Sequence, residues 1–262
     1  FYAIHVRNEN TRAAKALSSA SLDTAQTAAA AADVKLTKIE RYDLNTVTGI
    51  LNAISERDIT EVVLGMHRRA TVIDSFFGLK VEQLLRATNR MVIISRCYIP
   101  LNTVTRIVVA VPRGAQYETG FSRWVRAIAR LTRQLGCRVI FCCHADVQPL
   151  IRGVLYQENY GVRCEFRTIE SLDEMILMTG RILDDDLFIV ISARAHSVSH
   201  TDEVTEMPSL LQRNFSRNNI IVIYPEQFGE APALTSFSDP LASDLSTTPT
   251  GWLTKLWKRV GK

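Results

Sequence analysis

Apolar and polar positions along the chain follow two different patterns. Short, mostly apolar runs predict strands, and longer segments with apolar residues three or four positions apart predict amphipathic helices. The predicted strands are residues 1–6, 34–42, 61–64, 91–95, 106–111, 138–144, 162–169, 187–192 and 220–224. The predicted helices are residues 11–32, 43–57, 75–88, 120–135, 147–159 and 172–183, with a further short helix before the last strand. Because strands alternate with helices, the pattern predicts an α/β fold with a doubly wound parallel sheet covered on both faces.

Local signals refine some of these elements. Asp43 and Asn45 are candidates to cap the start of the 43–57 helix, and Gly136 is suited to end the helix before it. The 34–42 strand alternates apolar and charged residues, which predicts a position near a sheet edge. The 61–64 strand is mostly apolar and is expected to be buried.

The strand pattern occurs twice. Strands near residues 34–42, 62–65 and 91–94 correspond to strands near 162–169, 189–192 and 220–223 at an offset of about 128 residues, which indicates an internal repeat. The strand at 2–6 likewise matches 140–144. The second copy opens with a strand and a helix, residues 106–135, that the first copy lacks. Since the first strand of a doubly wound sheet is usually central, we expect the missing pair upstream of Phe1, the alternative being a first copy that is naturally incomplete.

A glycine-bounded basic loop is the main candidate binding site. Gly65 ends an apolar strand, the basic residues His67, Arg68 and Arg69 follow, and Gly78 precedes an amphipathic helix. Backbone N–H groups and a helix N-terminus at the carboxyl edge of a parallel sheet form an anion or phosphate site. The alternative is that Gly65 only ends the strand and the arginines are solvated.

This loop resembles the nucleotide loop of the universal stress protein family. The family pattern is Gly, two residues, Gly, nine residues, Gly, then Ser or Thr. Gly65 and Gly78 match the first and third glycines, whereas Arg68 stands at the second glycine and Leu79 at the hydroxyl position. The side chain of Arg68 crowds the place of a phosphate, although its guanidinium can bind one from the side.

Further motifs resemble the tandem stress-protein-like C-terminal region of bacterial sodium/proton antiporters, of the monovalent cation:proton type. They are RYDLN at 41–45, DSFFG at 74–78, PLNT at 100–103, RIVVAVP at 106–112, YETGFSRWV at 117–125 and YPEQ at 224–227. The resemblance implies two units, 1–98 and 99–229, packed as a pseudo-dimer, with 230–262 as a linker and basic tail. It also implies an upstream transmembrane antiporter domain in the same polypeptide, a homodimer, and a location on the cytoplasmic face of the bacterial inner membrane.

The equivalent loop of the second copy is a weaker candidate. Residues 192–196 contain no glycine, and the aspartate that stress-protein nucleotide sites commonly have after the first strand is replaced by Pro112 and Arg113. We therefore expect this copy to be a structural partner. Any ligand of the first copy is expected to be ATP, ADP, AMP or a cyclic dinucleotide.

No set of residues predicts catalysis or a metal site. His5 and His144 end equivalent strands and are expected to be packed and hydrogen-bonded, and the acidic run at 184–186 is expected to cap a turn. The five cysteines form no CxxC pair, which predicts free thiols. We expect no enzymatic activity.

Composition and net charge limit which classes of binding partner the sequence favours. The chain has 262 residues, of which 47% are hydrophobic and 22% charged, as in ordinary globular proteins. The net charge of +4 permits contact with nucleic acid or anionic lipid without demanding either, and we expect no nucleic acid partner. No apolar run reaches the roughly 18 residues that a membrane span needs.

The tail has its own pattern. Residues 230–250 are rich in Ser, Thr, Pro and Ala and predict a linker. An apolar stripe that includes Trp252 and Trp257 follows, with Lys255, Lys258 and Arg259 around it. Such a basic helix suits an anionic membrane interface, and a helix that folds back onto its own protein is the alternative.

Three functions remain open at this stage. The leading expectation is a non-catalytic regulatory domain of an antiporter that senses a ligand at the loop from Gly65 to Gly78. The alternatives are a free-standing stress protein that binds ATP or AMP, and a purely structural assembly domain whose nucleotide loops are vestigial.

Overall fold

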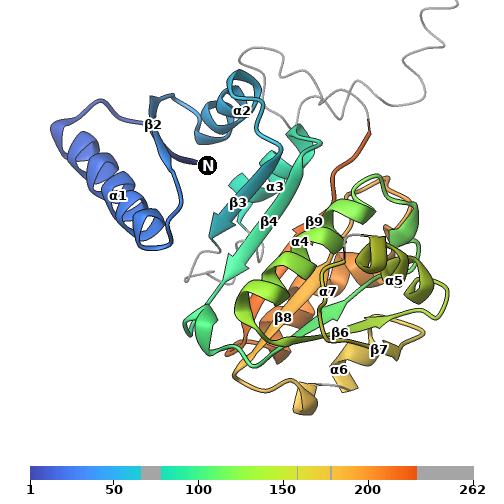
Figure 1. The fold of residues 1–262 in the computed structure, drawn as a ribbon. Helices are drawn as coiled ribbons and strands as arrows, with labels where there is room; N and C mark the ends of the chain where they lie inside the picture. Colours follow the sequence, from blue (N-terminus) through green and yellow to red (C-terminus); the bar gives the residue numbers. More distant parts are fainter. Residues whose placement is uncertain (66–77, 158, 178, 229–262) are drawn as a thin grey trace, which may run out of the picture. The chain divides into compact units, whose positions relative to one another are not determined.

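The computed structural model describes residues 1–65, 78–157, 159–177 and 179–228 (Figure 1). Within these residues, contacts divide the chain into two compact units. One unit contains residues 1–59 and 80–88, and the other contains 60–65, 78–79 and 89–228. This division groups residues by contact, whereas the repeat boundary expected at residue 98 rests on sequence correspondence and stays a prediction.

The larger unit is built on a seven-stranded sheet with the order β3-β4-β9-β8-β5-β6-β7. The strands are β3 (Glu61–Gly65), β4 (Met91–Arg96), β5 (Arg106–Ala110), β6 (Arg138–Cys143), β7 (Cys164–Thr168), β8 (Asp186–Ile191) and β9 (Asn219–Tyr224). Every pairing is parallel except that of β4 with β9, which is antiparallel. The predicted α/β fold with parallel strands is confirmed.

Helices cover both faces of this sheet (Figure 1). They are α4 (Phe121–Leu135), α5 (Gln148–Gln157), α6 (Glu174–Leu177) and α7 (Asp202–Asn214). On one face Trp124 and Ile128 of α4 and Ile151 of α5 pack in one buried cluster with alternate residues of the strands. On the other face Phe188 of β8 contacts Phe215, which ends α7, with 4.7 Å between ring centroids. The sheet is therefore doubly wound, as the alternating pattern predicted.

The smaller unit contains β1 (Tyr2–Arg7) and β2 (Thr37–Tyr42), which pair in parallel as a two-stranded sheet. Its helices are α1 (Arg12–Ala31), α2 (Thr46–Glu56) and α3, which is Leu79–Ala87 and whose first residue belongs to the other unit. The predicted cap is confirmed at α2, since the Asn45 side chain accepts a hydrogen bond from the Val47 amide at 2.8 Å.

Two sequence predictions are wrong in extent. The helix expected over 172–183 is reduced to α6 and a 3-10 turn at Thr179–Arg181. The strand expected to be buried at 61–64 has only Val62 buried and leaves 66% of Val63 exposed, because among the described strands β3 pairs with β4 alone, at the end of the sheet.

Candidate functional site

The carboxyl ends of β5, β6, β7 and β8 lie at the same edge of the large sheet, because these four strands are parallel. Open α/β sheets bind ligands in the crevice outside this edge. The loops that follow these strands carry Arg113, His144, Glu170 and Arg194. A ligand site formed by these four strands is therefore expected at this edge.

The loop after β8 folds back over the loop after β5. Gly114 adopts a left-handed backbone with a φ of 78°, and a Cβ atom there would lie 3.3 Å from the carbonyl oxygen of Val198. Only glycine takes this backbone angle without strain. The loop after β8 thus occupies space beyond the carboxyl end of β5.

The buried carboxylate of Glu118 lies at this edge of the sheet, which we call the closed edge because the loop after β8 covers it. One carboxylate oxygen accepts hydrogen bonds from the Ser199 amide at 2.9 Å and from the Ser199 hydroxyl at 2.6 Å. The other accepts a bond from the Gln227 side chain at 2.7 Å. Burial raises the pKa of Glu118, but the bonds from Ser199 and Gln227 outweigh it and hold the pKa below its ordinary value of 4.5. The Ser199 donors just ahead of α7 are thereby satisfied by a side chain of the same molecule.

Arg194 also serves the structure. Its guanidinium donates to the carbonyl oxygens of Pro225 and, at 2.6 Å, of Arg90. Burial lowers its pKa to about 10, so it stays charged at neutral pH. An arginine directly after β8 is well placed to hold a phosphate, but these carbonyl bonds tie it to the neighbouring chain segments.

Two motifs far apart in the sequence meet at this edge. The Gly120 amide donates to the Glu226 carbonyl oxygen at 3.1 Å, and the Arg123 guanidinium lies 3.3 Å from the Glu226 carboxylate. A Cβ atom on Gly120 would lie 2.5 Å from the Glu226 amide nitrogen. The 117–125 motif and the 224–227 motif therefore hold each other in place by a backbone hydrogen bond, an ion pair and close backbone packing. Their sequences did not predict this structural role.

His144 bridges two carboxylates at the ends of β6 and β7. Its Nδ1 lies 2.6 Å from Asp146, and its Nε2 lies 3.2 Å from Glu170. The bond with His144 is the main cause of the lowered pKa of Asp146. The hydrogen bond to Asp146 agrees with the expectation for this histidine, although both carboxylates are exposed and the bridge lies at the surface. Among the described residues, no cluster of His, Cys, Asp or Glu is suited to hold a metal ion.

The cysteines are free thiols, as predicted. Three of them have strongly raised pKa values. Burial raises the pKa of Cys142 to about 11 and the pKa values of Cys143 and Cys164 to about 12. Because the thiolate is the reactive form of cysteine, these raised pKa values disfavour reaction of the three thiols at neutral pH.

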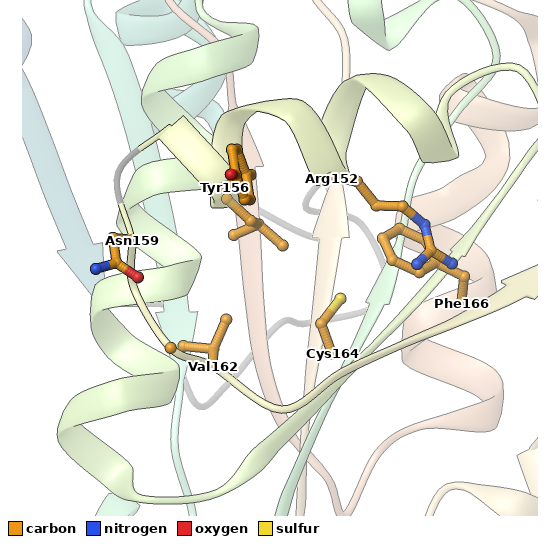
Figure 2. Close-up of a pocket in the computed structure, with 8 residues that line it drawn as sticks. Arg152, Tyr156, Asn159, Val162, Cys164 and Phe166 are labelled. Atoms are coloured by element: carbon orange, nitrogen blue, oxygen red, sulfur yellow. The ribbon is translucent and has the colours of Figure 1, made fainter.

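A hollow lies at the opposite, amino end of β7 (Figure 2). It has a volume of about 250 Å³, and Cys164, Val162 and Tyr156 are among its lining residues. Figure 2 shows the Arg152 guanidinium against the Phe166 ring, 4.2 Å from the ring centroid. Lined mainly by apolar atoms and one stacked arginine, the hollow presents no convergent set of polar groups for a nucleotide.

The loop predicted from the first copy is described only at its two ends. Gly65 is exposed at the end of β3, and Gly78 has a φ of 83°, a left-handed angle that suits glycine. Gly78 is half-buried, and among the described residues no atom beyond the chain neighbours lies within 4 Å of a Cβ atom built at either glycine. His67, Arg68 and Arg69 lie outside the described residues, as do the tail residues Trp252, Lys255, Trp257, Lys258 and Arg259.

No helix in the described ranges combines the length and the apolar character needed to cross a membrane. No protein-family model matches the chain, and no curated protein matches its sequence.

Solved structures share the fold over most of the chain. A candidate universal stress protein from Pseudomonas aeruginosa UCBPP-PA14 has a TM-score of 0.53 at 13% identity, covering 86% of this chain and 82% of that one. A protein of unknown function from Pseudomonas aeruginosa PAO1 gives the same values. A universal stress protein from Archaeoglobus fulgidus DSM 4304 has a TM-score of 0.52 at 14% identity, covering 81% and 78%. The chain therefore has a universal stress protein-like fold, and at these identities the likeness extends to the fold alone.

Proposed function

We propose that this chain is a non-catalytic regulatory region of a bacterial monovalent cation/proton antiporter. In this proposal it lies on the cytoplasmic face of the inner membrane and is joined to the transport domain in one polypeptide, which forms a homodimer. The motifs from residue 41 to residue 227 are the reason for choosing this family. The universal stress protein-like fold is consistent with that choice.

The proposal includes two stress-protein-like copies that form a pseudo-dimer within the chain. The antiparallel pairing of β4 with β9 supports it, because these are the last strands of the two copies and β9 begins 128 residues after β4. Ile94 pairs with Val222, its own equivalent at that offset. Val92 pairs with Tyr224, and the equivalent pair, Ile220 with Arg96, also forms. A residue pairing of this reciprocal kind is the signature of a two-fold interface.

The two copies have different roles in this proposal. In the second copy the carboxyl edge of the sheet is closed by Glu118 and Arg194, which favours a structural role. The loop between Gly65 and Gly78 is the ligand site in this proposal, and the left-handed backbone of Gly78 is consistent with a glycine-bounded turn there. The single observation that carries this assignment is the Glu118 carboxylate on the Ser199 donors, since it removes the competing site.

A ligand at the first loop would act on transport by binding one state of the antiporter more tightly than another. The ligand class is a nucleotide, either ATP, ADP or AMP or a cyclic dinucleotide. Phosphate binding would use backbone amides and the guanidinium of Arg68.

Isothermal calorimetry on the 262-residue chain tests the ligand site. We expect binding of at least one of ATP, ADP, AMP and the cyclic dinucleotides. The Arg68→Ala variant should weaken it about tenfold or more, since a charged phosphate contact contributes roughly 1.5–3 kcal/mol. Arg133→Ala, which removes an exposed arginine from α4, is the charge-matched control and should leave the affinity unchanged. The absence of heat with every nucleotide would leave the structural alternative in its place.

A further inference from the structure

Strand β1 uses only one of its two edges among the described residues. The Thr37 amide donates to the Phe1 carbonyl oxygen at 2.9 Å, and the Asp43 amide donates to the Arg7 carbonyl oxygen at 3.0 Å. In a parallel strand the backbone groups of alternate residues point to alternate sides. The odd-numbered residues of β1 therefore face β2, and the N–H and C=O groups of Ile4 and Val6 face the other edge.

The same strand is poorly covered. Each residue of β1 is exposed or only half-buried, whereas five of the six residues of β6, its counterpart in the second copy, are buried. The neighbouring helix α1 buries only Ser18 and Leu22 of its 20 residues. Parallel sheets are normally buried on both faces, and a two-stranded sheet is marginally stable by itself.

Within the part of the chain that the structure describes, the unpaired edge of β1 lacks the devices that protect natural sheet edges. Such edges usually carry Pro, Lys, a bulge or a very short strand. β1 has six residues in continuous register with β2, and neither Lys nor Pro occurs in it. β3, in the other unit, is also paired on one side only as far as the described strands show, and its counterpart β8 is paired on both sides.

The second copy indicates which strand and helix would lie against the unpaired edge of β1. There, β5 pairs in parallel with β6, and the amphipathic helix α4 leads directly from β5 to β6. α4 ends at Gly136, which has a φ of 64°, and β6 begins two residues later at Arg138. A strand and a helix of this kind would therefore stand immediately before β1 in the sequence.

We propose that the open edge of β1 binds a parallel apolar strand that, with the amphipathic helix following it, is joined to the chain ahead of Phe1. The strand would satisfy the backbone groups of Ile4 and Val6, and the helix would cover the exposed face of β1. This proposal rests on the two-copy arrangement proposed above but not on nucleotide binding or on transport.

Amide hydrogen exchange tests the proposal directly. The 262-residue chain is compared with the same chain extended by the residues that its source gene encodes immediately before Phe1, about 35 of them to hold one strand and one helix. We expect the amides of Ile4 and Val6 to exchange about 100-fold more slowly, or slower still, in the extended chain. The amides of Ala3 and His5, which face β2, are internal controls and should be protected in both chains at the start of exchange.

A second variant keeps the test independent of overall stability. A proline in the middle of the added strand should return Ile4 and Val6 to fast exchange and leave the amides of β6 unchanged. Equal exchange at Ile4 and Val6 in the two chains would overturn the proposal. A reading frame that begins at Phe1 would also overturn it. Both results leave the calorimetric outcome untouched, so failure of this proposal is distinguishable from failure of the ligand site.

Discussion

At the scale of single residues, Glu118 is the group on which the closed edge depends. It is 5% exposed and accepts three hydrogen bonds, from the amide and hydroxyl of Ser199 and from Gln227. Because its pKa is lowered in the folded state, it contributes stability above its ordinary pKa of 4.5. That contribution is lost as the pH falls through the lowered folded pKa.

We therefore expect Glu118→Gln to lower the free energy of unfolding by about 1–3 kcal/mol at pH 7, since one acceptor becomes a donor that faces other donors. The difference from wild type should shrink below pH 4.5 as the wild-type carboxylate is protonated. Urea unfolding at a series of pH values measures both effects. Glu165→Gln is the control, because the exposed Glu165 only lies 3.5 Å from Arg138 and should matter by less than about 0.5 kcal/mol. A pH-independent difference would contradict the assigned role of Glu118.

Residue-level prediction from the sequence was accurate for local roles and poor for long-range ones. The cap at Asn45 and the helix end at Gly136 were predictable because their signals lie within a few residues of the helix. The bond between Glu118 and Gln227 joins residues 109 positions apart, and no local pattern carries it. The motifs of the resemblance did mark both residues, but as family features without a physical role.

At the scale of elements, the contact of α4 with the chain after β9 is unusually close. Gly120 stands at the start of α4, where an added methyl group would lie 2.5 Å from the Glu226 amide nitrogen. Backbone atoms cannot yield as the end of a flexible side chain can. The glycine is thus required by packing, while its own backbone angle is ordinary, with a φ of −76°.

Gly120→Ala should lower the free energy of unfolding by about 1–3 kcal/mol, because the two backbones must separate. Gly153→Ala is the matched control, since Gly153 lies in α5 and, among the described residues, no atom outside the nearby backbone of that helix lies within 4 Å of the added methyl group. There alanine should stabilise by about 0.5–1 kcal/mol through its better helix propensity. Thermal unfolding of the two variants beside wild type measures the contrast, and equal shifts would refute the packing argument.

Elements with a strong period were predicted well, and those set by tertiary context were not. The buried runs of β5, β8 and β9 and the apolar stripe of α4 appear as expected, because burial on both faces or on one face fixes their patterns. The 61–64 segment reads as buried but lies at a sheet end, since apolar composition alone does not distinguish a central strand from one that awaits a neighbour.

At the scale of the whole molecule, the sequence predicted the fold class through its alternation of strands and helices. It did not predict that β4 would pair with β9, because strand neighbours depend on contacts across 128 residues. That pairing explains why β3 and β4 group by contact with the strands from β5 to β9, although the repeat in the sequence places them with β1 and β2. The tail from residue 230 onward and the centre of the first loop stay predictions.

The proposed function makes these 262 residues a region of an integral membrane antiporter. An antibody raised against the purified chain, used to immunoblot the membrane and soluble fractions of the source cells, tests it most directly. We expect a band in the membrane fraction well above 29.4 kDa, large enough to include a transport domain. Recombinant chain added to lysed cells before fractionation controls for adsorption to membranes. A band near 29.4 kDa in the soluble fraction, with no larger membrane species, would contradict the claim and favour a free-standing stress protein.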